Sequence, residues 1–396
     1  MSRNYALINK ETLNYIVKQK EVTLDYISKK IKITPEKINN LLDSNNNQLL
    51  TIKQAKSLAS CLHVPFAALY MNQKDIQLKR IPQYRNRRVN YADTPYDDSS
   101  LKIAIIDALY ERDFLIETNK DFSFHTKVFA PIQPHNDNPP DTWANEIKKQ
   151  FSIEDISSFR SFSPRKFYLY LKQKIEEQGI FIYCFTDVPV QCARGFSILQ
   201  DSLPIIGINN EDRHPAKIFS IIHELVHLFK RESSVCNTLY DSENKQDIEV
   251  FCNAVAGEFL VPKRKLFEYT KNKVSYSANE IKEIARRFYV SRDVIIRRLY
   301  DLDEINYDTY CAFAETFKRE LMQDNEEKRQ NNEKPNFRKF IGRDVFDQTS
   351  LHISKILYHG YNKGIYSQYY LSKYLGINSK HLNGFLSEAS KIKWHN

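Results

Sequence analysis

Residues 220–229 read SIIHELVHLF, and this stretch decides how the rest of the chain is interpreted. Apart from Glu224 and two histidines, its positions are uncharged, which predicts a helix buried within the fold. His223 and His227 are four residues apart, so both imidazoles lie on one face of that helix and can converge on one point. Convergent imidazoles are typical zinc ligands. Glu224 lies beside them and could accept a proton from a water that the metal activates.

A helix whose two histidines serve packing alone would explain the same ten residues equally well. A third ligand on another helix is therefore needed to favour a metal centre. Residues 247–262 read DIEVFCNAVAGEFLVP and predict a second helix that packs into the same core. Glu249 and Asn253 are again four residues apart, so the carboxylate can bind the metal while the amide orients a ligand histidine. Two histidines and one glutamate leave a fourth position open, which is the catalytic arrangement of zinc.

The scarcity of cysteine fits a zinc site built from histidine and glutamate, although Cys252 could in principle reach a metal. The six cysteines are scattered along the chain with no CxxC pair, so they predict neither a disulfide framework nor a thiolate zinc site. Cys252 precedes Asn253 and points to a different face of its helix, which predicts a packed core thiol.

The location expected from these features is the cytoplasm. Cysteines without a disulfide pattern suit a reducing compartment. The first ten residues, MSRNYALINK, lack the apolar stretch of about 7 to 15 residues of a signal peptide. No segment offers about 18 uninterrupted apolar residues for a membrane span, so no membrane partner is expected.

The charge of the 396-residue chain is concentrated at one end. The whole chain has 58 Lys and Arg against 49 Asp and Glu, a net charge of +9. Residues 1–90 contain 16 basic and 6 acidic side chains, a net charge of +10, and the remainder is close to neutral. A basic segment is typical of a nucleic-acid-binding module, because phosphate neutralisation provides most of the non-specific affinity. A solvated lysine-rich surface explains the charge equally well.

Residues 9–72 predict short helices separated by tight turns. Thr23 precedes an apolar stripe formed by Leu24, Ile27 and Ile31, and a second helix restarts at the TPEK stretch of residues 34–37. Threonine suits the N-cap of that helix and proline its first position. Two helices joined by about three residues predict a helix-turn-helix.

The segment from VTLDYISKKIKITPEKINNLLDS to LTIKQAKSLASCLHVPFAALY resembles the phage-repressor (XRE) type of helix-turn-helix over roughly 60 residues. The resemblance implies that the second helix enters the major groove of double-stranded DNA. The DNA-binding residues that it implies are Thr34, Lys37, Asn39 and Asn40. Lys32 stands where that family often has a glycine in the turn. A degenerate module for dimerisation or partner docking is the alternative.

The chain also resembles the ImmA/IrrE family of zinc metallopeptidases (the DUF955 group), which are gluzincin-like. The landmarks are IPQYR (81–85), IEEQGIFIY (175–183), RGFSI (194–198), PIIGIN (204–209), HELVHLF (223–229) and EVFCNAVAGEFLVP (249–262). The resemblance implies that His223, His227 and Glu249 bind the metal, that Glu224 is the general base and that Asn253 supports the ligands. The implied cofactor is one zinc ion per chain, with Mn²⁺ or another divalent metal as the alternative.

The predicted fold is mainly α with a small antiparallel sheet, an α+β class. The predicted parts are a helix-turn-helix domain (1–75), a linker (76–100), a metallopeptidase domain (101–306) and a C-terminal helical region (307–396). Within the third part, RGFSI could be an edge strand that pairs with an extended peptide or an ordinary sheet strand. Residues 280–299 have the rhythm of another helix-turn-helix, which we interpret as packing.

The resemblance implies a zinc endopeptidase and DNA-binding transcriptional regulator. It would cleave a repressor or antitoxin-like protein and so relieve repression in a stress response or in mobile-element control. Its partners would be that protein substrate and double-stranded DNA, and a homodimer is compatible with this function. The alternative is a non-enzymatic helix-turn-helix transcription factor with a structural or vestigial metal site.

Overall fold

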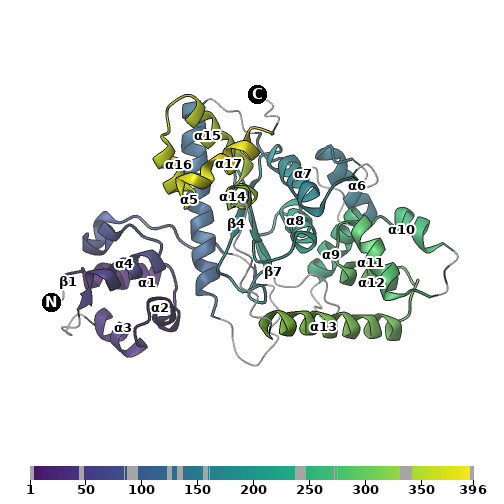
Figure 1. Ribbon diagram of the computed structural model, residues 1–396, viewed down its shortest axis with the longest axis horizontal. Coiled ribbons are helices and arrows are strands. Elements are labelled where there is room, and N and C mark those ends of the chain that lie inside the picture. Colours follow the sequence, from purple (N-terminus) through teal and green to yellow (C-terminus); the bar gives the residue numbers. More distant parts are fainter. Residues whose placement is uncertain are drawn as a thin grey trace. The chain divides into compact units, whose positions relative to one another are not determined.

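A computed structural model describes residues 4–43, 49–83, 85–86, 97–122, 127–131, 137–154, 159, 161–236, 247–271, 273, 275–330 and 341–392. Helices dominate and the strands form two sheets, which confirms the predicted α+β class (Figure 1). The chain divides into two compact units. The first comprises Met1–Gln83, Asn90–Phe114 and Thr186–Cys192, and the second comprises Tyr84–Val89, Leu115–Phe185 and Ala193–Asn396.

The first unit is a small helical bundle with a two-stranded antiparallel sheet. Its elements are β1 (Tyr5–Ala6), α1 (Lys10–Gln19), α2 (Leu24–Ile31), α3 (Pro35–Leu42), β2 (Leu50–Thr51), α4 (Ile52–Cys61), η1 (Phe66–Tyr70), η2 (Gln73–Asp75) and the first part of α5 (Ser99–Phe122). Its core combines Leu13 of α1, Ile27 of α2, Ile38 of α3 and Leu58 of α4, and Ile103 of α5 packs into the same cluster.

The predicted pair of helices at residues 24–42 is present, with both threonine caps. Thr23 Oγ1 accepts a hydrogen bond of 3.1 Å from the Tyr26 amide, and Thr34 Oγ1 accepts one of 3.4 Å from the Lys37 amide. Lys32 ends α2 in the left-handed conformation, with φ of 57°. This conformation costs a residue other than glycine about 1 to 2 kcal/mol, which a folded unit can tolerate. Of the predicted linker, residues 84 and 87–96 lie outside the described residues.

The second unit is built around a five-stranded sheet. In spatial order its strands are β3 (Arg85–Asn86), β7 (Ser234–Cys236), β5 (Gly195–Ile198), β6 (Ile205–Asn209) and β4 (Phe181–Phe185). β5 runs antiparallel to β6 and β7, whereas β4 pairs with β6 and β3 with β7 in parallel, so this sheet is mixed rather than wholly antiparallel. Because both edges of β5 are already paired, RGFSI is an internal strand, and the edge-strand alternative is wrong.

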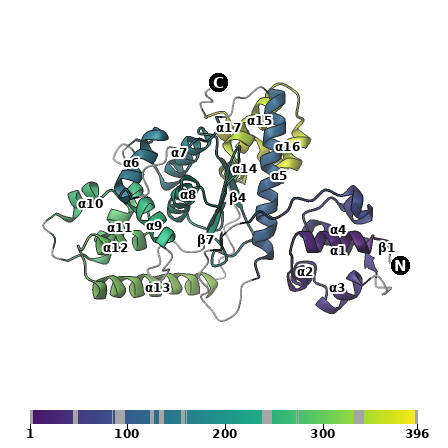
Figure 2. The ribbon, with the colours of Figure 1, turned by 180° about the vertical axis from the view of Figure 1, so that it is seen from behind.

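Helices cover this sheet and provide most of the core. They are α6 (Pro140–Gln150), α7 (Pro164–Glu176), α8 (His214–Phe229), α9 (Asp247–Leu260), α10 (Lys263–Thr270), α11 (Ala278–Arg287), α12 (Arg292–Asp301) and α13 (Tyr307–Gln330). Figures 1 and 2 show α8 between the sheet and α9. Every residue from Ala216 to Phe229 is buried, which includes residues 220–229, for which the sequence predicted a buried helix. Helices α11 and α12 pack their apolar faces into the same core.

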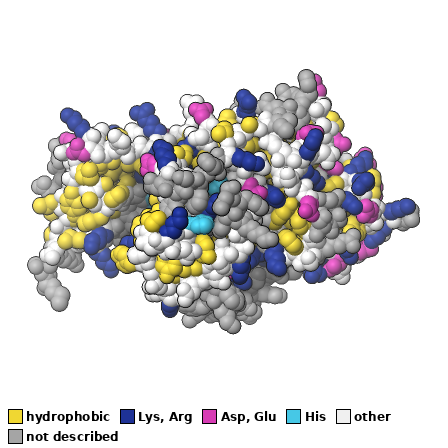
Figure 3. Space-filling model, turned by 90° about the horizontal axis from the view of Figure 1, so that it is seen from above, with side chains coloured by type: hydrophobic (Ala, Val, Ile, Leu, Met, Phe, Trp, Pro, Cys, Tyr) yellow, Lys and Arg dark blue, Asp and Glu magenta, His cyan; other side chains and the backbone are white. Residues whose placement is uncertain are grey.

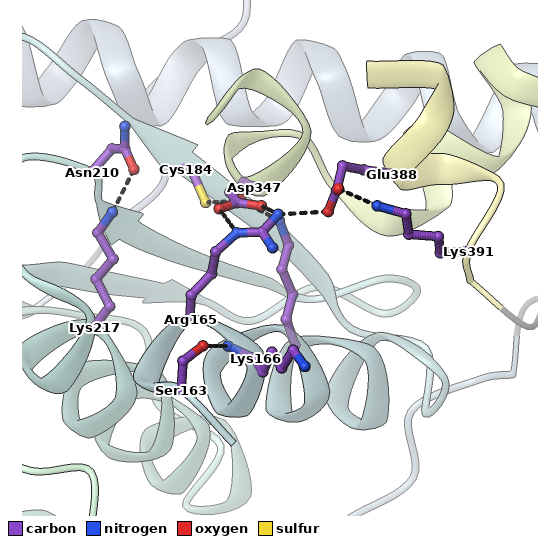
Figure 4. A network of polar contacts seen from close by, with 10 residues as sticks. Ser163, Arg165, Lys166, Cys184, Asn210, Lys217, Asp347, Glu388 and Lys391 are labelled. Atoms are coloured by element: carbon purple, nitrogen blue, oxygen red, sulfur yellow. Dashed lines mark hydrogen bonds and ion pairs between the residues drawn. The ribbon is translucent and has the colours of Figure 1, made fainter. Parts of the chain in front are cut away.

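The C-terminal helices belong to the second unit. They are α14 (Ile341–Gln348), α15 (Leu351–Asn362), α16 (Gln368–Tyr374), the 3-10 helix η4 (Ser379–His381) and α17 (Leu382–Ala389). Arg165 of α7 donates two hydrogen bonds of 2.6 Å to Asp347 and one of 2.8 Å to Glu388 (Figure 4). Lys172 lies two turns further along the same face of α7, and its Nζ donates hydrogen bonds to the main-chain oxygens of Asp347 and Thr349. Charged side chains of α7 therefore hold α14 and α17 against the rest of the second unit.

The face of the molecule drawn in Figure 3 carries both charged and hydrophobic side chains. On this face, Lys and Arg side chains are interspersed with Asp and Glu and with hydrophobic side chains. Among the described helices, none combines the length and the apolar character needed to cross a membrane.

Candidate metal centre

Three buried side chains from α8 and α9 converge in the second unit. His223 and His227 project from one face of α8, and their Nε2 atoms are 3.1 Å apart. Glu249 of α9 lies against both: its Oε2 is 3.3 Å from His223 Nε2, and its Oε1 is 3.2 Å from His227 Nε2. Each of the three side chains belongs to a residue that is no more than 3% exposed. The structure thus brings together the three residues predicted as metal ligands.

The spacing of these atoms fits a zinc ion. Nitrogen and oxygen ligands about 2.0 to 2.1 Å from zinc, at the corners of a tetrahedron, are about 3.3 Å from one another. The separation of 3.1 Å between the two imidazole nitrogens is close to that value, as are the 3.3 and 3.2 Å contacts that the two carboxylate oxygens of Glu249 make with His223 and His227. A carboxylate and two imidazoles buried together are costly unless their lone pairs have partners, and one divalent cation provides a partner for all three.

The contact between Glu249 and His223 shifts the pKa of both groups. Burial alone would raise the pKa of Glu249, but hydrogen bonds to His223 and His227 outweigh it and hold that pKa well below its ordinary value. Burial alone would lower the pKa of His223, but the hydrogen bond and charge of Glu249 outweigh it and raise that pKa. The carboxylate is therefore ionised at neutral pH, and a buried negative charge beside two imidazoles favours a cation.

Glu224 points toward the sheet, where it contacts β7. Its Oε2 accepts a hydrogen bond of 3.1 Å from Ser234 Oγ, and Ser234 Oγ is 2.9 Å from Ser197 Oγ of β5. Gly195 makes room for the carboxylate, because a Cβ at that position would lie 3.0 Å from Glu224 Oε1. Burial raises the pKa of Glu224, and the nearby imidazoles offset part of this rise. A carboxylate with a raised pKa is well matched to proton transfer near neutral pH.

Asn253 lies one turn beyond Glu249 on α9 and is 5% exposed. Its side chain is close enough to His223 to contribute to the raised pKa of that imidazole. His223 Nδ1 and Asn253 Oδ1 are both buried without a hydrogen bond. A hydrogen bond between these two groups would be the supporting role that the sequence predicts for Asn253.

A cysteine that the sequence analysis assigned no role stands at the same centre. Cys236 ends β7, and its Sγ lies 3.7 Å from His227 Nε2 and 3.6 Å from Glu249 Oε2. One potential ligand atom from each of His223, His227, Cys236 and Glu249 lies within 4.8 Å of the others. Cys252 is also close, but its Sγ lies 3.7 Å from His227 Nδ1, the other ring nitrogen. Cys252 is buried in the core, as predicted.

Comparison with known protein families bears on the segment that carries all these residues. Residues 175–300 match the Peptidase_M78 family model, described as an IrrE N-terminal-like domain. This segment of the chain is therefore similar to metallopeptidase domains, and it contains the whole buried cluster. The chain matches none of the curated proteins and none of the solved structures with which it was compared.

The residues predicted to contact DNA lie on or next to α3 of the first unit, outside the matched segment. Thr34 is occupied as the N-cap of α3, where its hydroxyl accepts from the Lys37 amide. Lys37 and Asn39 are exposed, and Asn40 is half-buried. Two side chains of α3 are thus fully available to a ligand, and Thr34 contributes chiefly to the helix end.

The side chains of His214, Tyr240 and Tyr269 have the chemistry to stabilise an oxyanion. His214 stands nine residues before His223, about 13 Å along α8 at 1.5 Å per residue, and it packs edge-on against Tyr168. Tyr269 packs edge-on against Phe288. Tyr240 lies outside the described residues. Both described side chains therefore have packing contacts that explain their positions.

Proposed function

We propose that the second unit is a zinc-dependent endopeptidase that cleaves a repressor or antitoxin-like protein. The observation that carries this proposal is the convergence of His223, His227 and Glu249, with the Glu224 carboxylate beside them in the segment similar to metallopeptidases. In this proposal His223, His227 and Glu249 hold the metal. A centre built only for structure does not need a second buried acid next to its ligands.

Bound zinc supplies a Lewis acid that activates water and polarises the scissile carbonyl group. Glu224 accepts the proton of the attacking water and returns it to the leaving amine. Ser234 holds Glu224 Oε2 and so fixes the direction of the carboxylate. The tight packing around α8 keeps bulk water from His223 and His227, which strengthens their interaction with a cation.

The peptidase proposal is tested with the protein and its Glu224→Gln variant. Both are incubated with candidate repressors encoded beside the gene, with and without a chelator, and products are followed by mass spectrometry. We expect cleavage by the wild type alone, and only without chelator. Equal cleavage by both proteins, or none with any divalent metal, would contradict the proposal.

We further propose that the first unit binds double-stranded DNA and that the chain acts as a transcriptional regulator. Support comes from residues 1–83 of this unit, which carry 13 basic and 6 acidic side chains, a net charge of +7, and from the exposed Lys37 and Asn39 on α3. Asparagine can pair bidentately with adenine, and lysine can neutralise a phosphate. Repression would then be relieved when the second unit cleaves its protein partner.

DNA binding is tested with a variant in which Lys37, Asn39 and Asn40 are replaced by alanine. Operator DNA is selected from a random pool with the wild type, and affinity is measured by fluorescence anisotropy. Loss of base contacts worth about 1 to 3 kcal/mol each predicts a weakening of tenfold or more. Lys53→Ala, an exposed substitution on α4, is the matched control. Unchanged affinity of the triple variant would remove α3 as the recognition helix.

A non-enzymatic transcription factor with a structural metal is the competing function, and one observation favours it. The Cys236 thiol stands where a catalytic centre keeps an exchangeable position, and a four-ligand centre is typical of structural zinc. Hydrolysis that depends on Glu224 would exclude this alternative.

A further inference from the structure

The position of Cys236 is set by the sheet. Cys236 is the last residue of β7, is 2% exposed, and lies opposite Gly195 of β5 in the ladder. Its carbonyl oxygen accepts a hydrogen bond of 2.8 Å from the Arg194 amide. On its other side β7 pairs with β3 at Ser234 and Val235. The backbone that carries this thiol is therefore paired with both neighbouring strands.

Two distances from the thiol match those of a fourth zinc ligand, and the four potential ligand atoms lie within 4.8 Å of one another. A sulfur about 2.3 Å from zinc lies about 3.5 to 3.6 Å from a nitrogen or oxygen ligand in a tetrahedral centre. Cys236 Sγ is 3.7 Å from His227 Nε2 and 3.6 Å from Glu249 Oε2. These two distances are comparable to the separations of 3.1 to 3.3 Å among the Nε2 atoms of His223 and His227 and the carboxylate oxygens of Glu249.

Cys252 provides an internal contrast. Its sulfur is equally near His227, at 3.7 Å, but it contacts Nδ1 rather than Nε2. The two ring nitrogens point in different directions, so an ion bound at Nε2 lies away from a sulfur next to Nδ1. The chain thus has two buried thiols against one histidine, and the geometry suits only Cys236 for coordination.

We propose that Cys236 is the fourth ligand of this centre and that its sulfur occupies the position that hydrolysis requires, so that the resting protein is a latent peptidase. Metal binding breaks the S–H bond, the sulfur keeps the electron pair, and the proton leaves to solvent. Hydrolysis begins only when the sulfur yields its position to water. Latency rests on the proposed peptidase function, whereas the ligand assignment does not.

The presence of Glu224 favours a latent catalytic centre over a purely structural metal centre. In a permanently closed centre the buried carboxylate held by Ser234 would have no proton to transfer. With Cys236 displaced, the same carboxylate lies beside the three remaining ligands. Ser234 also links the two groups, since its Oγ is 3.1 Å from Glu224 Oε2 and 3.8 Å from Cys236 Sγ.

The ligand assignment is tested by zinc X-ray absorption on the full chain loaded with one equivalent of zinc. We expect a sulfur shell at about 2.3 Å in the wild type and in Cys252→Ser, and its loss in Cys236→Ser and Cys236→Ala. Two substitutions at position 236 guard against a folding defect in either one. Cobalt substitution gives a second readout, a thiolate-to-cobalt absorption band that depends on the same residue. A wild-type spectrum without sulfur, or one that Cys236→Ser leaves unchanged, would overturn the assignment.

Latency is tested by cleavage of a library of unstructured peptides, read by mass spectrometry. Cys236→Ala is expected to cleave about tenfold faster than the wild type or more, which corresponds to about 1.4 kcal/mol by which sulfur outcompetes water. Glu224→Gln in the same background should abolish the gain. A sulfur shell with equal cleavage by the wild type and Cys236→Ala would overturn latency. A sulfur shell with no cleavage by any variant would contradict both the peptidase proposal and latency, while it would support the ligand assignment.

Discussion

Ser234 Oγ donates a hydrogen bond of 3.1 Å to Glu224 Oε2, and this contact links the central sheet to the acid beside the metal ligands. Burial raises the pKa of Glu224, and the Ser234 hydroxyl opposes that rise because it stabilises the carboxylate. The hydroxyl therefore acts on the protonation state of Glu224 as well as on its direction.

Removal of this hydroxyl is expected to shift the pH profile of hydrolysis. In Ser234→Ala the pKa of Glu224 rises further, so the active carboxylate form is lost at a higher pH as the solution is acidified. The acidic limb of the pH profile of kcat/KM should move to higher pH, while the plateau at high pH changes less. Ser197→Ala is the matched comparison, because Ser197 reaches Glu224 only through Ser234, and its shift should be smaller. An unmoved limb in Ser234→Ala would remove Glu224 as the titrating base.

A methyl group at position 195 is expected to displace the same carboxylate. The Cβ of Gly195→Ala would lie 3.0 Å from both Glu224 Cγ and Oε1, and 3.2 Å from the main-chain oxygen of Gly207. Misplacement of a reacting group by about 1 Å can cost about 10²-fold in rate, so kcat should fall by at least tenfold. Gly384→Ala on α17, whose nearest contact would be an ordinary 3.4 Å, serves as the control. Equal kcat values in the two variants would show that Glu224 adapts without loss.

The sequence predicted the part of the centre that depends on helical periodicity. His223 with His227, and Glu249 with Asn253, are each one turn apart, and any helix places such pairs on one face. That α8 and α9 would meet followed from their apolar faces. Ser234 and Cys236 could not be predicted in this way, because their places depend on the pairing of β7 with β5, which are separated by a helix in the chain. Register between distant strands has no local signal.

The same reasoning explains which parts of the fold were harder to predict. The caps Thr23 and Thr34 act within their own helices, and the structure has both. The internal position of β5 depends on strands on either side of it, which the alternation of its own four residues cannot reveal. The attachment of the C-terminal helices depends on pairs such as Arg165 with Asp347, which are 182 residues apart.

Metal removal is expected to destabilise the wild type and to leave Glu249→Gln unchanged. A ligand that binds only the folded state stabilises it by about 2.7 kcal/mol at a hundred times its Kd, so a chelator should lower the wild-type Tm by several degrees. The pKa of His223 is raised, so protons compete with the metal for this imidazole more strongly as the pH falls through the raised pKa. The affinity of the centre for the metal should therefore decrease at acidic pH. Glu268→Gln, at an exposed position of α10, should keep the response to chelator. An equal response in Glu249→Gln would exclude Glu249 as a ligand.

Arg165 is expected to control the docking of the C-terminal helices, with a defined dependence on pH. Its hydrogen bonds to the carboxylates of Asp347 and Glu388 predict a loss of about 1.5 to 3 kcal/mol in Arg165→Ala. Burial alone would raise the pKa of Glu388, but hydrogen bonds from Lys391 and Arg165 outweigh it and lower that pKa. The contribution of Glu388 is therefore complete above its ordinary pKa and is lost as the pH falls through the lowered value.

The measurement for this interface is thermal unfolding of the wild type and Glu388→Gln between neutral and acidic pH. The difference in Tm between them should be largest near neutrality and should shrink as Glu388 of the wild type becomes protonated. Lys380→Ala is the control, because Lys380 is an exposed lysine of η4 that does not contribute to the lowered pKa of Glu388. A difference in Tm that stays constant down to acidic pH would show that the Glu388 side chain acts by packing alone, since its charge would then make no contribution to the docking of α17 on α7.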